Sequence, residues 1–255
     1  MSTSTPSLIN RVALVTGAGV GIGRATALLL AQAGATVGIH YHTSEAGAEE
    51  TALAIRKAGG QAHLAQGDLT KEADTNRIVD QLIDKTGRLD ILFNNAGSPL
   101  KYTTIEACSL EHWNNVFAVN VASAFLVTRR AIPHLRLSNH GAIVNNLTLS
   151  IQTGGAGGGG VYAAAKGALQ VMTRTLAKEL APTVRVNAIM PGVIATAHHE
   201  TFSTPAKMEE YRKQTALGRN GAADEVAQAV LFLASDASSF MTGAILDVNG
   251  GRFMR

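Results

Sequence analysis

The feature that most constrains the fold is a regular alternation of short apolar runs with segments of helical spacing. The first run, Val12–Val15, leads through a glycine-rich turn into apolar residues spaced as on one helix face, which stop at Gly34. The next run begins at Thr36, and Glu45–Ala58 again has a helical pattern. Later runs of the same kind are Leu89–Phe93, Ala142–Val144, Val184–Ile189 and Ile245–Val248. This order predicts an α/β fold, a doubly wound parallel sheet with helices on both faces.

The length of the chain suits one such domain. No linker rich in Pro or Ser divides the 255 residues. Residues 1–10 are polar and lack the apolar core of a signal peptide, so they predict a disordered tail before a single domain over residues 11–255. The stretch Gly154–Gly160 is too short for a linker and predicts a mobile loop.

Charge and apolar runs argue against two classes of partner. The net charge is +3 and no block of consecutive Lys or Arg occurs, so we predict no nucleic-acid binding. The apolar runs fall short of the roughly 20 residues that a membrane-spanning helix needs, so we predict no membrane span. The single cysteine, Cys108, can form no internal disulfide and fits a reducing compartment. We therefore predict a cytoplasmic protein.

The turn after the first strand has the composition of a phosphate-binding loop. It runs from Thr16 to Gly23 with its glycines at G-x-x-x-G-x-G spacing. Glycines let the backbone approach a pyrophosphate, and the free N–H groups at the start of the following helix attract its charge. The same glycines would also suit a tight turn without a ligand. The predicted cofactor contacts here are Gly17, Gly19, Gly21, Ile22 and Gly23.

A second candidate site is the pair Tyr162 and Lys166 at the start of a helical pattern. Residues four apart share a helix face, so the two side chains are neighbours. A nearby ammonium favours the phenolate and lowers the pKa of a tyrosine, which would let Tyr162 exchange a proton with a carbonyl or an alcohol. A Tyr and a Lys at this spacing are also common on solvated helix faces. Both motifs are therefore needed to predict an enzyme.

Together the two motifs resemble the short-chain dehydrogenase/reductase family, in its compact branch of about 250 residues. Further segments along nearly the whole chain resemble motifs of that family. These are Asp68-Leu69, Asn94-Asn95-Ala96-Gly97, Asn120, Pro191-Gly192-Val193-Ile194-Ala195-Thr196, Asp224-Glu225-Val226-Ala227, Phe232–Asp236, Thr242-Gly243 and Asn249-Gly250-Gly251. The resemblance implies a Rossmann-like fold and an NAD(P)-dependent oxidoreductase acting on a ketone or secondary alcohol, of the carbonyl reductase or alcohol dehydrogenase type.

The resemblance also implies roles for single residues. Tyr162 would be the general acid and base, Lys166 would tune it and hold the nicotinamide ribose, and Asn120 would anchor a water in a proton relay. Asn120 could instead be a structural asparagine with satisfied hydrogen bonds, and Asp68 a turn or helix cap. The cofactor contacts implied beyond the glycine turn are Asp68, Leu69, Asn94, Ala96, Gly97, Tyr162, Lys166, Pro191, Gly192, Ile194 and Thr196.

One segment departs from the family pattern. The family carries a catalytic serine after the fifth strand, but here Ile143-Val144-Asn145-Asn146 is followed by Leu147-Thr148-Leu149-Ser150. Counting from the strand puts Thr148 at the serine position, because loops tolerate an inserted residue where strands do not. Ser150 stays an alternative for the hydroxyl that orients the substrate.

The end of the second strand bears on the choice of cofactor. Tyr41 stands where NAD-preferring relatives carry an acidic residue, and His42, Thr43 and Ser44 follow it. No carboxylate is there to repel a 2′-phosphate, and the hydroxyls can donate to one. We predict NADP(H) over NAD(H), although no arginine accompanies these residues; an open pocket without preference is the alternative.

Other functions and partners fit the sequence less well. A nucleotide-binding regulator without catalysis should lack Tyr162 or Lys166, and a sugar-nucleotide epimerase of the longer branch needs more C-terminal length. Residues 195–218 lie where the family places its substrate lid. His198 and His199 stand there without a third ligand at useful spacing, so we predict no metal site. By analogy with the family we expect a homotetramer.

Overall fold

Seven parallel strands form one sheet in the computed structural model, which describes residues 7–155 and 157–254. Their order is β3-β2-β1-β4-β5-β6-β7, so the predicted doubly wound parallel sheet is confirmed. The strands are β1 (Val12–Val15), β2 (Thr36–Tyr41), β3 (Ala62–Gln66), β4 (Ile91–Asn94), β5 (Gly141–Asn146), β6 (Val184–Pro191) and β7 (Ile245–Val248). Sequence reasoning missed β3, because its Ala-His-Leu-Ala-Gln mixes polar and apolar residues and pairs only with β2.

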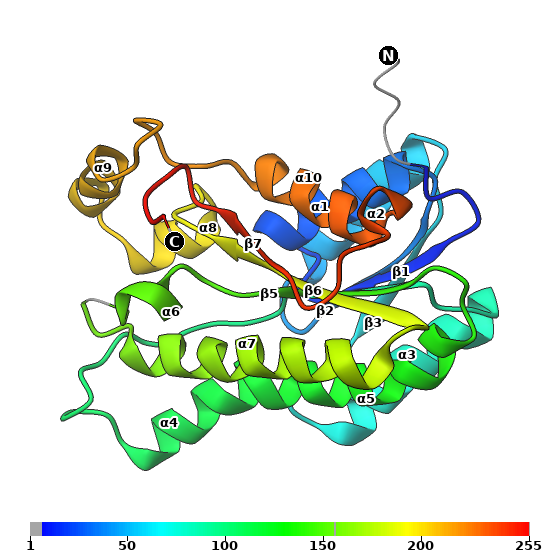
Figure 1. Cartoon of the computed structure of the whole chain (residues 1–255), viewed down its shortest axis with the longest axis horizontal. Helices are drawn as coiled ribbons and strands as arrows, with labels where there is room; N and C mark the ends of the chain where they lie inside the picture. The colour runs from blue at the N-terminus through cyan, green and yellow to red at the C-terminus, as the bar shows by residue number, and fades with distance from the viewer. Residues whose placement is uncertain (1–6, 156, 255) are drawn as a thin grey trace.

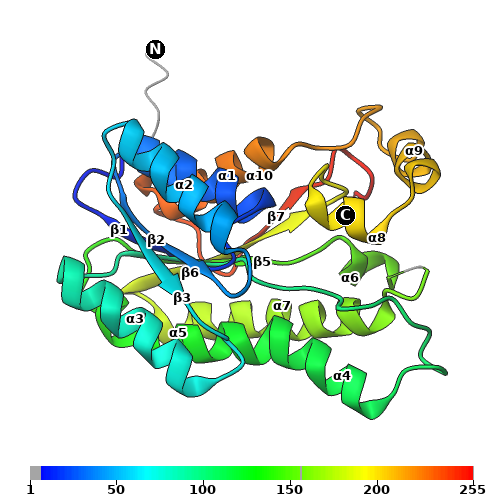
Figure 2. The same ribbon diagram turned by 180° about the vertical axis from the view of Figure 1, so that it is seen from behind.

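Helices cover both faces of the sheet. Figure 1 shows α1, α2 and α10 on one face and α3, α5 and α7 on the other, and Figure 2 shows the same layers from behind. The helices are α1 (Gly21–Gln32), α2 (Glu45–Lys57), α3 (Glu72–Thr86), α4 (Leu110–Phe117), the π-helical turn η1 (Ala118–Ala122), α5 (Ser123–Arg136), α6 (Ser150–Thr153), α7 (Gly160–Leu180), α8 (Ala197–Phe202), α9 (Pro205–Lys213), α10 (Ala223–Ala234) and the 3-10 turn η2 (Asp236–Ser238). The predicted lid contains α8 and α9.

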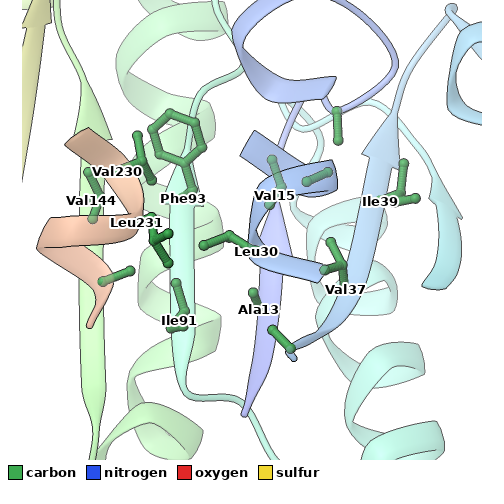
Figure 3. Close-up of a cluster of buried hydrophobic side chains, with 14 of the residues drawn as sticks. Ala13, Val15, Leu30, Val37, Ile39, Ile91, Phe93, Val144, Val230 and Leu231 are labelled. Carbon is green, nitrogen blue, oxygen red and sulfur yellow. The ribbon is translucent and has the colours of Figure 1, made fainter. Parts of the chain in front are cut away.

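The larger core lies between the sheet and the helices α1 and α10. Figure 3 shows Leu30 of α1 and Leu231 of α10 directed at the side chains of β1 and β4. Phe93 of β4 is completely buried among them. The strands are apolar without alternation because helices bury both of their faces. Replacing Phe93 by alanine would cost about 3–5 kcal/mol, and this packing fixes the strand ends that carry the site.

The folded chain begins earlier than predicted. Leu8, expected in the disordered tail, is fully buried in the core, and its N–H donates to the carbonyl of Ala33 at 2.7 Å. Gly34, which has a φ of +102°, allows this approach, because a Cβ there would lie 2.8 Å from the side chain of Ile9. The prediction rested on the polar composition of residues 1–10, but the single apolar residue Leu8 is enough to fix the end of this segment to the core. Residues 1–6 of the predicted tail lie outside the described residues.

One helical segment is longer than the predicted limit for apolar runs. Within the described residues, the segment Leu110–Arg136, which joins α4, η1 and α5, is long and apolar enough by length and composition to cross a membrane. It packs against α3 and α7. Arg129 and Arg130 on it pair with Glu72 and Asp80 of α3. These contacts are those of a core helix, in which Val116, Val127 and Leu135 are completely buried.

Candidate active site

The carboxyl ends of the parallel strands open into one cleft of about 1110 Å³. The glycine turn follows β1, Asn95–Gly97 follow β4 and Thr148 follows β5, so residues far apart in sequence meet at this edge of the sheet. The predicted residues that line the cleft are Gly17, Gly19, Gly21, Ile22, Tyr41, His42, Thr43, Ser44, Ala96, Gly97, Thr148, Ser150, Tyr162, Lys166, Pro191, Gly192, Ile194 and Thr196. Gly23, Asp68, Leu69, Asn94 and Asn120 are not in its lining.

Backbone contacts hold the glycine turn in place. A Cβ at Gly19 would lie 2.9 Å from the carbonyl oxygen of Ser44, and one at Gly23 would lie 2.1 Å from that of Gly17. The glycines therefore let the turn pack against the start of α2 and against α1. Gly23 serves this packing and is not exposed to the cleft. The first N–H groups of α1 have no side-chain cap and no acidic residue beside them, which fits a bound pyrophosphate.

His40 supports the same turn, and sequence reasoning missed it. Its Nδ1 accepts a hydrogen bond of 3.1 Å from the N–H of Gly17, and its Nε2 donates to the carbonyl of Gly67 at 3.1 Å. This pattern requires the neutral ring with its proton on Nε2. Burial lowers the pKa of His40 to about 4, so the ring stays neutral at ordinary pH. No local sequence signal could have paired His40 with Gly17 and Gly67, which follow the ends of β1 and β3.

Tyr162 and Lys166 lie together on the first turns of α7, as predicted. The Lys166 Nζ is 5.9 Å from the centre of the Tyr162 ring and donates to the carbonyl oxygen of Asn146 at 2.7 Å. Lys166 is only 1% exposed. Burial lowers the pKa of its ammonium to about 8.

The expected lowering of the tyrosine pKa is wrong for this structure. Burial raises the pKa of Tyr162 above its ordinary value, and the phenol of Tyr102 adds to the effect. Burial disfavours the charged form of each group, so it raises the pKa of the Tyr162 phenol and lowers the pKa of the Lys166 ammonium. Tyr162 is therefore a protonated phenol at neutral pH, ready to donate.

Asn120 donates both hydrogens of its side-chain amide to protein carbonyls. Its Nδ2 donates to the carbonyls of Ser98 at 2.7 Å and Val116 at 2.8 Å, and its Oδ1 accepts from the N–H of Ser98 at 3.1 Å. It lies in η1, where the wider turn interrupts the helix, and it is completely buried. A Cβ at Gly97 would lie 2.5 Å from the Asn120 Oδ1, so only glycine fits at position 97 beside this asparagine. The side-chain amide has no hydrogen left for a water.

Two further predicted cofactor residues have structural contacts. Asp68 Oδ1 accepts from both the N–H and the hydroxyl of Thr70, as in a turn cap. Asn94 is buried and its Nδ2 donates to Thr128 at 3.0 Å and to Asn145 at 2.9 Å. These contacts use the Oδ1 of Asp68 and the Nδ2 of Asn94, whereas the buried Oδ1 of Asn94 has no hydrogen-bond partner among the described residues.

Thr148 and Ser150 both line the cleft, but they are held differently. The N–H groups on either side of Thr148, from Leu147 and Leu149, donate to the carbonyls of Ile189 and Pro191, so Thr148 continues the strand pairing of β5. Ser150 begins the short helix α6, and its N–H donates to the Thr148 Oγ1 at 3.2 Å. The more rigid of the two hydroxyls is that of Thr148.

Other residues of the cleft were not predicted. Asn95 fixes the glycine turn through its Nδ2, which donates to the carbonyls of Thr16 and Gly17. Tyr102 meets Phe202 edge-on with ring centres 5.6 Å apart. Within the described residues no group of three His, Cys, Asp or Glu side chains could hold a metal ion. The side chains of His198 and His199 lie outside the described part of the chain.

Comparisons with known proteins agree with this architecture. A family model described as enoyl-(acyl carrier protein) reductase matches residues 17–252. The cyclopentanol dehydrogenase of Comamonas sp. (strain NCIMB 9872) is 40% identical over 244 residues, which cover 95% of this chain and 96% of that protein.

Two solved structures extend the comparison. The crystal structure of a short-chain dehydrogenase/reductase from Brucella melitensis has a TM-score of 0.92 at 32% identity, covering 99% of this chain and 100% of that chain. The structure of an NADH-dependent reductase, A1-R′, responsible for alginate metabolism has a TM-score of 0.89 at 33% identity, covering 97% and 99%. Similarity over almost the whole length shows that this chain is an oxidoreductase that belongs to the short-chain dehydrogenase/reductase family.

Proposed function

We propose that the enzyme transfers a hydride between NADP(H) and a ketone or secondary alcohol, with Tyr162 as the general acid and base. The observation that carries the proposal is that Tyr162, Lys166 and Thr148 line the same cleft as the glycine turn. A relative named cyclopentanol dehydrogenase supports the substrate class. A silent regulator would have no need of this arrangement.

The residues of the chain have separate tasks in this proposal. The nicotinamide, when bound, supplies or accepts the hydride at the substrate carbon. In reduction Tyr162 donates its hydroxyl proton to the carbonyl oxygen, and in oxidation it takes the proton from the alcohol. Thr148 donates a hydrogen bond to the same oxygen and orients it. Lys166 provides positive charge beside the phenol.

Proton supply needs a path from solvent to Tyr162. We assign the relay water to the main chain of η1, because both hydrogens of the Asn120 side-chain amide are donated to protein carbonyls. Its side chain then has the task of shaping η1 behind Gly97 and Lys166.

The preference for NADP(H) rests on the residues after β2. Tyr41, His42, Thr43 and Ser44 line the cleft without a carboxylate among them. The hydroxyl of Ser44 caps no backbone N–H of α2, so it is free to donate to a 2′-phosphate at the start of that helix. The structural neighbour described as NADH-dependent makes this preference a point to test. Ratios of kcat/KM for NADPH and NADH measure it, and a ratio in favour of NADH would refute it.

The test of catalysis is Tyr162→Phe, which keeps the ring and removes the hydroxyl. We expect kcat to fall by about a hundred- to ten-thousandfold, because a general acid contributes that much. Cofactor binding, measured by fluorescence titration, should change little. Substrates come from a spectrophotometric screen of ketones and alcohols. A variant that keeps more than about a tenth of the rate would refute the assignment.

The predicted cytoplasmic homotetramer is part of the same proposal. Size-exclusion chromatography with light scattering tests the assembly, and a monomer in solution would refute it.

A further inference from the structure

A partly buried arginine lies at the outer end of the cleft. Arg252 belongs to the cleft lining, as does Tyr162. Its guanidinium carbon is 4.4 Å from the centre of the Tyr211 ring, and its Nη2 donates to the Oε1 of Gln214 at 2.9 Å. Partial burial lowers the pKa of Arg252, which still leaves a guanidinium charged at any ordinary pH. Among the described residues it forms no ion pair, and the carboxylate of Glu210 acts on its charge only from beyond salt-bridge distance.

The backbone fixes this position. Gly250 and Gly251 have φ values of +63° and +76°, and a Cβ at Gly250 would lie 2.7 Å from the side chain of Thr215. The N–H of Leu217 donates to the carbonyl of Gly250 at 3.1 Å. This turn folds the end of the chain against the segment after α9. In Figure 1 the C-terminal segment returns to the side of the molecule that holds α6, α8 and α9. Arg252 is therefore a built part of the cleft wall.

The neighbouring charges leave Arg252 as the unneutralised one. Lys207 lies 5.2 Å from the centre of the same Tyr211 ring, but its Nζ pairs with Glu210 at 3.0 Å. Glu210 also accepts from the Nε2 of Gln214 at 2.9 Å. Glu210 is the one carboxylate among the described residues that line the cleft. Arg252 thus lines a cleft whose one carboxylate among the described residues, Glu210, is already paired with Lys207.

Aromatic side chains connect this end with the reacting end. Tyr102 and Tyr211 line the same cleft as Tyr162 and Arg252, and the ring of Tyr211 is in contact with the guanidinium of Arg252. A substrate that reacts at Tyr162 can therefore extend past Tyr102 toward Tyr211 and Arg252.

We infer that Arg252 binds an oxyanion at the far end of the substrate, so that the preferred substrates are ketones or secondary alcohols bearing a carboxylate or a phosphate. The inference rests on the proposed hydride transfer at Tyr162. A guanidinium presents several N–H donors in a plane and matches a carboxylate with two parallel hydrogen bonds. Gln214 uses one of these donors and holds the group in place, and the others are free for the ligand.

Matched substrates test the inference. A series of keto acids of increasing chain length is compared with the corresponding methyl esters and with a phosphate-bearing ketone. We expect kcat/KM of the wild-type enzyme to favour the best anion over its neutral counterpart about ten- to a hundredfold. Arg252→Met should remove this preference and leave the esters nearly unchanged. Arg252→Lys should keep part of the preference for anions, because the positive charge remains although the planar set of N–H donors is lost. The acid and phosphate arms decide which oxyanion is preferred.

Two control variants distinguish an anion-binding role of Arg252 from a purely structural one, in which Arg252 only holds the C-terminal segment against the predicted lid. We call this structural role a latch. Gln214→Met breaks the link between α9 and the tail but keeps the arginine charge, so the preference for acids should survive. The double variant Lys207→Met/Glu210→Gln removes the neighbouring ion pair without leaving an unpaired carboxylate near Arg252, and it should also keep the preference for acids. If Arg252→Met and Gln214→Met lower kcat/KM equally for acids and esters, Arg252 is only a latch and the inference is overturned.

A binding measurement separates this inference from the proposed function. Levulinate is titrated calorimetrically into the enzyme saturated with NADP⁺, for the wild type and for Arg252→Met. Binding that requires Arg252, without turnover of any carbonyl compound, would keep the anion site and refute hydride transfer. Turnover of esters and acids alike, without Arg252-dependent binding, would keep hydride transfer and overturn the anion site.

Discussion

The two halves of the cleft are built in different ways. Around the glycine turn the wall is backbone, locked by contacts such as the one between Gly23 and Gly17, and stiffened by the buried His40. On the substrate side the wall is made of side chains from short segments, and neither α6 nor α9 has a buried residue. A rigid half suits a constant ligand and a lightly anchored half suits a variable one. The comparison teaches that the cofactor-binding half can be predicted from local sequence motifs, whereas the substrate-binding half can be recognised only in the tertiary structure.

The largest effect should come from adding one methyl group to the rigid half. In Gly23→Ala the new Cβ meets the carbonyl of Gly17, and neither backbone segment can move aside, so we expect a loss of about 3 kcal/mol or more of stability and weak cofactor binding. Thermal unfolding with and without NADP(H) measures both.

The matched control on the substrate side is Gly154→Ala. A Cβ at Gly154 meets nothing within 4 Å, so only its φ of +76° matters, at a cost of about 1–2 kcal/mol. Cofactor affinity should stay unchanged. Equal loss of cofactor binding in both variants would contradict the difference between the halves.

The next prediction concerns Thr148, which lies where the cofactor half and the substrate half of the cleft meet. Thr148→Ala should lower kcat by about ten- to a thousandfold, because a positioned hydrogen-bond donor is lost. Thr148→Ser should stay active, since it keeps the hydroxyl. Ser150→Ala should change mainly KM. An inactive Ser150→Ala beside an active Thr148→Ala would show that the register argument is wrong.

A smaller effect on stability is expected at Lys166. Its replacement should make the protein more stable although it removes activity. Burial lowers its pKa from 10.5 to about 8, so below pH 8 the folded state carries a charge that it disfavours. Lys166→Met should abolish activity and still stabilise the protein by about 2 kcal/mol below pH 8, after about 1 kcal/mol is subtracted for the bond to Asn146.

The pH dependence has a definite sign. The unfolded state binds more protons between pH 8 and 10.5, so the wild type gains stability there and the advantage of Lys166→Met shrinks. Melting temperatures of both proteins over this range measure it. A variant that is less stable than the wild type at every pH would contradict the burial of a charge.

The smallest effect is expected next to the catalytic pair, at Gly167 of α7. A Cβ there meets nothing within 4 Å, and alanine is the better helix former by about 0.5–1 kcal/mol. Gly167→Ala should raise the melting temperature by a few degrees with unchanged kcat. A loss of activity would show that α7 contacts substrate beyond Tyr162.

Local patterns predicted the sheet and much of the cofactor half. The glycine turn, the pair of Tyr162 and Lys166, and Thr148 after its strand depend on spacings within one or two elements, which a sequence displays directly. The strand β3 was missed because an edge strand needs few apolar residues. Leu8 was missed because a single buried residue leaves no period.

Long-range contacts account for the remaining differences. His40 meets Gly17 across the sheet, and Arg252 meets Gln214 over 38 positions, so no local pattern marks either residue. The pKa of Tyr162 is raised and not lowered as expected. The spacing of Tyr162 and Lys166 in the sequence shows that an ammonium is nearby, but it does not show that the phenol is buried. Charge partners can be read from sequence, whereas desolvation requires the fold.

The strand order has a consequence for how the protein reaches its folded state. The central strand β1 is hydrogen-bonded to β4, where Ala13 pairs with Ile91, so a closed loop of almost eighty residues must form before the middle of the sheet exists. The other parallel pairings close shorter loops, such as the one between Val12 and Thr36, so the β1–β4 pairing is the most distant in sequence. A loop of this length slows folding more than it reduces stability. The cleft lies across the β1–β4 junction, so it is incomplete in any intermediate that contains only the first three strands. Such an intermediate holds the glycine turn and the residues after β2 but lacks Tyr162 and Lys166, so the complete site can stabilise the chain through a bound ligand only once both halves of the sheet have joined.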